Sequence, residues 1–152
     1  MNEREALERH PFAAGLSDPQ ISALLPCARR VRYRAGAVIF REGAAATSLY
    51  LIITGGVALE QHVPGKGDLA LESLGPGDLL GLSWIFPGGH WLLTARATTD
   101  TDALELNARD VLQRMDLDPA LGFALSKHLV AQLCQRLERV RLQRLDVYRA
   151  PK

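Results

Sequence analysis

The segment with the most chemical character runs from Gly77 to Ala97 and reads GDLLGLSWIFPGGHWLLTARA. Its glycines can bring backbone N–H groups close to a ligand, and Trp84 and Trp91 offer aromatic faces. It has no formal charge between Asp78 and Arg96. The pattern indicates a turn that cradles a ligand and continues into a strand, with few groups able to hold an ion.

Catalytic and metal-binding chemistry finds little support elsewhere in the chain. The histidines stand singly in four different predicted elements and therefore form no cluster of metal ligands: His10, His62, His90 and His128. No Ser or Cys is spaced with a His and an acid in a way that selects a nucleophilic triad. The segment PGKGD at 64–68 lacks the second glycine and the Ser or Thr of a P-loop, and we interpret it as a hairpin tip. We expect no enzyme and no metal site.

Composition and charge narrow the class of protein further. A chain of 152 residues is long enough for one domain, and its net charge of +1 argues against a general binder of nucleic acid or membrane surfaces. The start, MNEREALERH, has no apolar stretch typical of a signal peptide or membrane span, so we expect a cytoplasmic protein. Cys27 and Cys134 are interpreted as small core or interface residues.

The middle of the chain alternates apolar and polar residues between regularly spaced glycines, which predicts short strands. A helix capped by Ser17 or Asp18 precedes them and ends near Pro26. The predicted strands are Arg30–Arg34, Ala37–Phe40, Ser48–Thr54, Val57–His62, Asp68–Ser73, Leu92–Thr98 and Ala103–Leu106. Many short strands with Gly-rich turns favour a β sandwich or a small barrel, of which the double-sheet jelly roll is one form.

A helical period returns after Leu106. Asn107 can cap a short helix, and a longer one follows from Asp118-Pro119 to about Tyr148. The long helix is predicted to present one apolar stripe to a second copy of the chain: Leu125, Leu129, Leu133, Leu137 and Val140. Roughly thirty residues would span about 45 Å, which is more than one small domain can cover. We therefore expect a homodimer formed through this helix.

Several motifs together resemble the cyclic-nucleotide-binding domain of the catabolite activator protein and its fumarate-nitrate regulator relatives. These are the EG at 42–43, LYLIITGGVAL at 49–59 and the GD at 77–78, in the family's order and spacing. The resemblance implies a mainly β fold: a double-stranded β-helix, or cupin-like jelly roll, with a short helix and a long C-terminal dimerisation helix. We expect a single domain, 1–152, made of N-terminal helices (1–28), the jelly roll (29–106) and C-terminal helices (107–152).

The resemblance also implies a phosphate cassette in which an Arg, a Glu and a helix N-terminus hold the cyclic nucleotide. Gly81 matches the glycine of that cassette, while Leu82 stands in place of the Glu and Ser83 follows. The phosphate-binding Arg aligns with Trp91 or, with a one-residue gap, with His90. Arg136 and Leu137 align with the helix segment that reaches the base. The candidate ligand residues are Gly81, Leu82, Ser83, His90, Trp91 and Arg136.

Two hypotheses on function follow. In the first, the chain is a regulatory sensor whose ligand, cAMP or cGMP, binds the 77–97 cassette and changes the position of the dimer helix. In the second, it is a ligand-free homodimeric module whose pocket is filled by its own tryptophans and which docks a protein partner. No other cofactor is expected. Only RLDVYRAPK follows Gln143, which leaves no helix-turn-helix module, and we expect no DNA binding by this chain alone.

Overall fold

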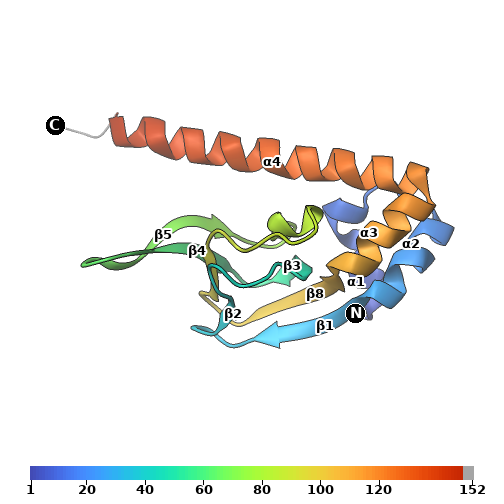
Figure 1. Ribbon diagram of the computed structural model, residues 1–152, viewed down its shortest axis with the longest axis horizontal. Coiled ribbons are helices and arrows are strands. Elements are labelled where there is room, and N and C mark those ends of the chain that lie inside the picture. The colour runs from blue at the N-terminus through green and yellow to red at the C-terminus, as the bar shows by residue number, and fades with distance from the viewer. Residues whose placement is uncertain (149–152) are drawn as a thin grey trace.

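The strands of the chain form two antiparallel sheets of four strands each, arranged as a sandwich (Figure 1). The computed structural model describes residues 1–148, with side chains over 1–145. One sheet has the strand order β1-β8-β3-β6 and the other β2-β7-β4-β5. This arrangement confirms the predicted jelly roll, in which strands distant in sequence become neighbours.

The strand positions follow the predicted pattern closely. Their bounds are Ala28–Tyr33 (β1), Val38–Phe40 (β2), Ser48–Thr54 (β3), Val57–Val63 (β4), Gly67–Leu74 (β5), Leu79–Leu80 (β6), Thr94–Ala97 (β7) and Thr101–Asn107 (β8). Strand β6 was not predicted, because two residues are too few to show an alternating pattern. The segment 64–66 is the turn between β4 and β5, as expected of a hairpin tip.

Short helices close one end of the sandwich (Figure 1). They are α1 (Glu3–Arg9), α2 (Asp18–Leu24) and the 3-10 turns η1 (Pro11–Ala13) and η2 (Leu25–Cys27). Ser17 caps α2 in a reciprocal capping box with Gln20, so the predicted start of this helix is confirmed. After the strands, α3 (Ala108–Leu117) is capped by Asn107, as predicted.

Helix α4 (Pro119–Tyr148) begins among these short helices and then runs along the sandwich above β4 and β5 (Figure 1). Its first turns belong to the main core, where Leu121 and Leu125 are fully buried with Phe12 of η1 and Leu104 of β8. A second apolar cluster, which includes Ile52, Leu59 and Leu80, lies between the sheets. The first half of α4 is therefore part of the domain itself.

The apolar stripe predicted along α4 is divided between two faces. Leu125 is fully buried and Leu129 is 8% exposed, both in the core of their own chain, so their prediction as contacts to a second copy is wrong. In an α-helix, a residue four positions further along is rotated by about 40° around the helix axis. A stripe of residues spaced by four therefore begins on the face toward the core and gradually turns away from it. The other three predicted residues are exposed, and together with two further exposed residues they are here called the outer stripe: Phe123, Val130, Leu133, Leu137 and Val140. Leu142 and Leu145 of α4 are exposed as well but are not counted in the outer stripe.

None of the helices in the described part of the chain has both the length and the hydropathy needed to cross a lipid bilayer. The division of the domain into residues 1–28, 29–106 and 107–152 stays a prediction, and its last four residues, 149–152, lie outside the described part.

Candidate functional site

The glycine of the cassette is in close contact with a tryptophan. Gly81 follows β6 with φ +98°, a left-handed conformation that glycine adopts without strain. A Cβ atom at this position would lie 2.8 Å from Cη2 of Trp91 and 3.0 Å from its Cζ3. The edge of the indole therefore rests directly on the backbone of the turn, and a side chain at position 81 would displace it.

Trp91 is fixed both by its ring and by its backbone. Its indole stacks on the ring of Phe40 in β2, with centroids 3.8 Å apart and planes 12° from parallel. Its N–H donates to the carbonyl of Ala44 at 2.9 Å, and its carbonyl accepts from the N–H of Gly43 at 2.8 Å. The side chain is 5% exposed. The ring is therefore a well-packed part of this structure.

The second tryptophan has a different role. Trp84 lies in the 3-10 turn η3 (Ser83–Ile85) and is 1% exposed within the main core. Its Nε1–H donates to the carbonyl of Gly81 at 2.9 Å, which satisfies the polar end of the ring. Of the two indoles, Trp91 fills the cassette, while Trp84 anchors the turn from the core side.

A small cavity remains between the cassette and α4, with a volume of about 130 Å³. Gly81, Leu82, Ser83, Trp91 and Arg136 line it, together with Phe40, Leu59, Leu92 and Leu93. The structure thus brings five of the six predicted ligand residues around one space. The sixth, His90, is exposed and is not among the lining residues. Sequence patterns did not indicate Phe40 and Leu59, because their place at the cavity depends on the pairing of the strands.

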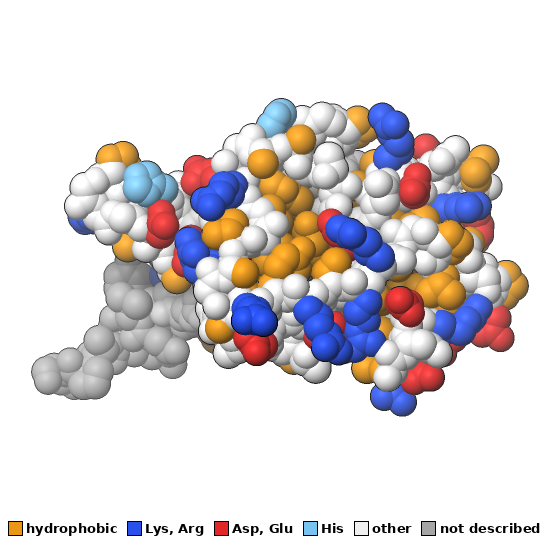
Figure 2. All heavy atoms as spheres, turned by 90° about the horizontal axis from the view of Figure 1, so that it is seen from below, with side chains coloured by type: hydrophobic (Ala, Val, Ile, Leu, Met, Phe, Trp, Pro, Cys, Tyr) orange, Lys and Arg blue, Asp and Glu red, His pale blue; other side chains and the backbone are white. Residues whose placement is uncertain are grey.

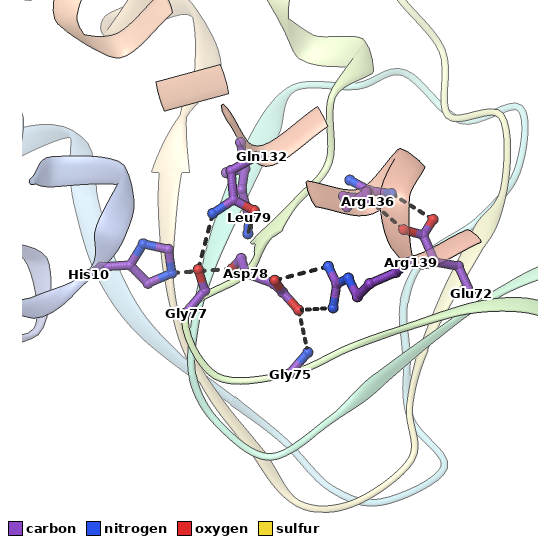
Figure 3. Close-up of polar contacts among 9 residues, drawn as sticks. All are labelled: His10, Glu72, Gly75, Gly77, Asp78, Leu79, Gln132, Arg136 and Arg139. Atoms are coloured by element: carbon purple, nitrogen blue, oxygen red, sulfur yellow. Dashed lines mark hydrogen bonds and ion pairs between the residues drawn. The ribbon is translucent and has the colours of Figure 1, made fainter. Parts of the chain in front are cut away.

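Among the described side chains that line this cavity, Arg136 is the one with a formal charge. Its Nε and Nη2 donate to the two carboxylate oxygens of Glu72 in β5 at 2.7 and 2.9 Å (Figure 3). The pair is largely shielded from solvent, with side-chain exposures of 12% and 17%. Because one carboxylate neutralises one guanidinium, the cavity has no net positive charge with which to attract a phosphate.

Further along the cassette, α4 is attached to the turn that leads into β6. Gln132 accepts from the N–H of Leu79 at 3.2 Å and donates to the carbonyl of Gly77 at 3.1 Å (Figure 3). Arg139 donates to both carboxylate oxygens of Asp78 at 3.1 and 3.2 Å, and that carboxylate also accepts from the N–H of Gly75 at 2.8 Å. The position of α4 and the conformation of this turn therefore depend on each other.

His10 reaches the same turn from the N-terminal helices (Figure 3). Its Nδ1 accepts from the N–H of Phe12 at 3.1 Å, so in the neutral ring Nε2 carries the proton and donates to the carbonyl of Asp78 at 3.2 Å. The side chain is 5% exposed. Burial lowers the pKa of His10 from 6.5 to about 4, against smaller opposing effects of the Asp78 carbonyl and charge.

This burial predicts an acid-dependent loss of stability. Since the pKa is lower in the folded chain than in the unfolded one, the contribution is complete above about pH 6.5 and is lost as pH falls toward 4. Between about pH 7.5 and pH 5 we expect His10 to lower the free energy of unfolding by about 2 kcal/mol. Urea unfolding of the wild type and of His10→Gln at both pH values measures it. An equal pH dependence in the two proteins would contradict the assignment.

Within the described residues, no three His, Cys, Asp or Glu side chains are close enough together to hold a metal ion. The two cysteines are free, Cys27 buried and Cys134 exposed on α4.

Comparison with known proteins agrees with this architecture. The cyclic nucleotide-binding domain family matches residues 30–118 of the chain. A CRP-like cAMP-activated global transcriptional regulator of Mycobacterium tuberculosis is 30% identical over 135 residues, which are 89% of this chain and 58% of that protein. The Thermus thermophilus cyclic AMP receptor protein is 30% identical over 133 residues, which are 88% of this chain and 60% of that protein. The chain thus spans about 60% of the length of these relatives.

Solved structures show the same likeness in three dimensions. The crystal structure of a Geobacter metallireducens protein has a TM-score of 0.79 at 28% identity and covers 90% of this chain and 99% of that one. The chain belongs to the cyclic nucleotide-binding domain family, in the superfamily of the catabolite activator protein.

Proposed function

We propose that this chain is a homodimeric regulatory module whose cassette is closed by its own Trp91 and does not take a cyclic nucleotide. The observation that carries this proposal is the contact of Trp91 with Gly81, because the indole occupies the space next to the turn that would approach a phosphate. The stack on Phe40 and the backbone hydrogen bonds of Trp91 hold it there. A cyclic nucleotide would have to displace a well-packed ring before it could bind.

The charge balance supports the same proposal. A phosphate in this cavity would meet Arg136 only after that guanidinium had left Glu72, and Leu82 offers no group to hold a ribose hydroxyl. His90, at one of the two positions that align with the phosphate-binding Arg, is exposed. A buried phosphate without its cation costs several kcal/mol, roughly the free energy that a useful ligand needs to gain.

The size of the cavity points the same way. Pockets for small ligands usually measure about 300 Å³ or more, whereas this one measures about 130 Å³. The space fits one ring, and a nucleotide has a base, a sugar and a phosphate. Binding would therefore require Trp91 to leave.

The dimer is proposed from the outer stripe of α4. Its members are spaced alternately by three and four residues from Val130 to Val140, the spacing with which two helices pack along a common seam. Between 43% and 68% of each side chain is exposed. A second copy that packs the same stripe would bury these residues, and the module could then present its other faces to a protein partner.

Direct contact with DNA is not part of the proposal. On the face opposite α4, Lys and Arg side chains are interleaved with Asp and Glu (Figure 2). On α4 itself, three of the arginines pair with acidic residues: Arg136, Arg139 and Arg141. A nucleic-acid interface requires a surface on which positive charge is concentrated.

The second candidate function is a cyclic nucleotide sensor, and the family match favours it. Two relatives are described as cAMP-activated or as a cyclic AMP receptor. In this case cAMP or cGMP would expel Trp91 from the cassette at 77–97. Arg136 would change partner, and because it lies on α4 the change would reach the proposed dimer helix.

One titration distinguishes the two candidates. Purified protein is mixed with cAMP, cGMP or a cyclic dinucleotide while tryptophan fluorescence and heat of binding are recorded, with 5′-AMP as the control. We expect no saturable signal at millimolar concentrations. Saturable binding of a cyclic nucleotide, but not of 5′-AMP, together with a change in tryptophan emission, would refute the closed cassette and establish the sensor.

A further inference from the structure

A row of polar side chains crosses three neighbouring strands on the sheet face that packs against the helices. In the register of the sheet, Arg32 of β1 lies opposite Asp102 of β8, and Asp102 lies opposite Thr54 of β3. Paired residues project to the same side of a sheet, so these three side chains lie next to one another. In the row closer to the helices, Leu104 pairs with Leu51, and both are fully buried in the main core. The apolar cover of this face therefore ends at the polar row.

The polar row lines a cavity of about 530 Å³, here called the strand-end cavity. It lies where β1 ends and β8 begins, at the end of the sandwich away from the short helices (Figure 1). Its other lining residues are Tyr33, Arg34, Asp100 and Thr101. Pockets for small ligands usually measure about 300–1,000 Å³. The strand-end cavity is within that range, and none of its lining residues belongs to the cassette at 77–97.

The carboxylates of the strand-end cavity already have partners. Arg30, which precedes the polar row on β1, donates from Nε to Oδ1 of Asp102 at 2.9 Å and also pairs through Nη2 with Oδ2. These bonds hold the pKa of Asp102 below its usual range against the opposing effect of burial, and the charge of Arg32 adds to the lowering. Asp100 accepts from the N–H of Ala35 at 2.9 Å. Both carboxylates are thus held in place, and the charge of Asp102 is neutralised.

Two arginines at the cavity have no such partner. Arg32 and Arg34 are exposed, and neither forms an ion pair or a side-chain hydrogen bond within residues 1–145, whereas Arg29 and Arg30 do. Each guanidinium presents a planar pair of N–H groups that matches one carboxylate. The Cα atoms of residues two apart along an extended chain are separated by about 6.6 Å. Two guanidinium groups spaced in this way suit two separate carboxylates better than one small anion.

We propose that the strand-end cavity binds a small dicarboxylate, with one carboxylate held by Arg32 and the other by Arg34. Counting Arg30, three arginines stand against two aspartates here, and this excess of positive charge favours an anion over a neutral compound. The hydroxyl group of Thr54 is a further donor at the end of the polar row. The inference goes beyond the proposed function and does not depend on it, because the cassette contributes no residue to this cavity.

The test compares three probes with the same four-carbon skeleton on the full chain. Succinate has two carboxylates, butyrate one and butanediol none. Binding is followed through backbone amide signals in proton–nitrogen NMR spectra at neutral pH and constant ionic strength. We expect succinate to bind with a dissociation constant in the millimolar range, about tenfold more tightly than butyrate, and butanediol to give no saturable shift. The signals that move should belong to the strand ends around Arg32 and Thr54, while the indole N–H signals of Trp84 and Trp91 stay in place.

Substitutions of single exposed arginines test the two positions. In Arg32→Gln and in Arg34→Gln one carboxylate loses its partner, so we expect about a tenfold loss of succinate affinity and equal binding of succinate and butyrate. Arg41→Gln removes the same charge from an exposed arginine outside the cavity lining and should leave the succinate affinity unchanged. Thermal unfolding of the three variants shows that they fold.

Several results would overturn the inference: no saturable shift with succinate, equal binding of succinate and butyrate to the wild type, or full succinate affinity in Arg32→Gln. An equal loss of affinity in Arg41→Gln would overturn it as well, because only the net charge of the chain would then matter. Tighter binding of inorganic phosphate than of succinate would show that the two arginines share one anion, and would refute the dicarboxylate. None of these results bears on the closed cassette, and binding of cAMP there would refute the closed cassette whatever succinate does. The two proposals can therefore fail separately.

Discussion

Replacement of both Leu133 and Leu137 by Glu is expected to halve the mass of the protein in sedimentation experiments while its circular dichroism spectrum stays the same. Both side chains lie in the outer stripe, with exposures of 43% and 68%. In the proposed two-fold dimer, four leucines would be buried, each worth about 1.5–3 kcal/mol, and four carboxylates would take their place. Such a change exceeds what a dimer of ordinary affinity can lose.

Two control variants distinguish an effect of the outer stripe from an effect of the rest of α4. Leu142→Glu adds the same charge to an exposed leucine outside the outer stripe, and we expect it to leave the mass unchanged. Leu125→Ala removes a fully buried side chain, and we expect it to lower the free energy of unfolding by about 3 kcal/mol without favouring monomers. If the double Glu variant kept the wild-type mass, the proposal that the outer stripe forms the dimer interface would be refuted.

Trp91→Ala is expected to lower the free energy of unfolding by about 3–5 kcal/mol, the usual cost of removing a buried aromatic ring. The substitution removes the stack on Phe40 and the contact with Gly81. Most of the loss should appear as a shift in the urea midpoint with little change in slope. Tryptophan emission of the variant then reports on Trp84 alone.

His90→Ala is the matched control, because the two residues are neighbours and are the two positions that align with the phosphate-binding Arg. His90 is exposed, and we expect its substitution to change stability by less than about 0.5 kcal/mol. Equal effects of the two substitutions would contradict the assignment of Trp91 as the ring that closes the cassette.

The strands and caps were predictable because their causes are local. Gly-rich turns separate the strands, and Ser17 and Asn107 cap helices within three residues of themselves. The departure of the cassette from the family pattern was also visible, in Leu82 and in the absence of an Arg at 90 or 91. These features can be predicted without knowing which distant segments of the chain contact one another.

What could not be predicted depends on contacts between distant segments. The stack of Trp91 on Phe40 brings together the segment before β7 and strand β2, and no local pattern in either segment predicts that contact. The faces of α4 were misassigned for a related reason. Leu125 and Leu133 look alike in sequence, and only the packing of the domain decides which of them faces inward.

The first half of helix α4 is held to the domain by apolar packing and the second half by polar contacts. The two kinds of contact are expected to persist for different times. Leu121 and Leu125 are in the core, so we expect the amide protons around them to exchange with solvent only when the domain opens. Beyond Gln132, polar contacts to Glu72 and Asp78 hold the helix, and they can break while the sandwich stays folded. We therefore expect the second half of α4 to open and close more often than the first half within the lifetime of a folded molecule.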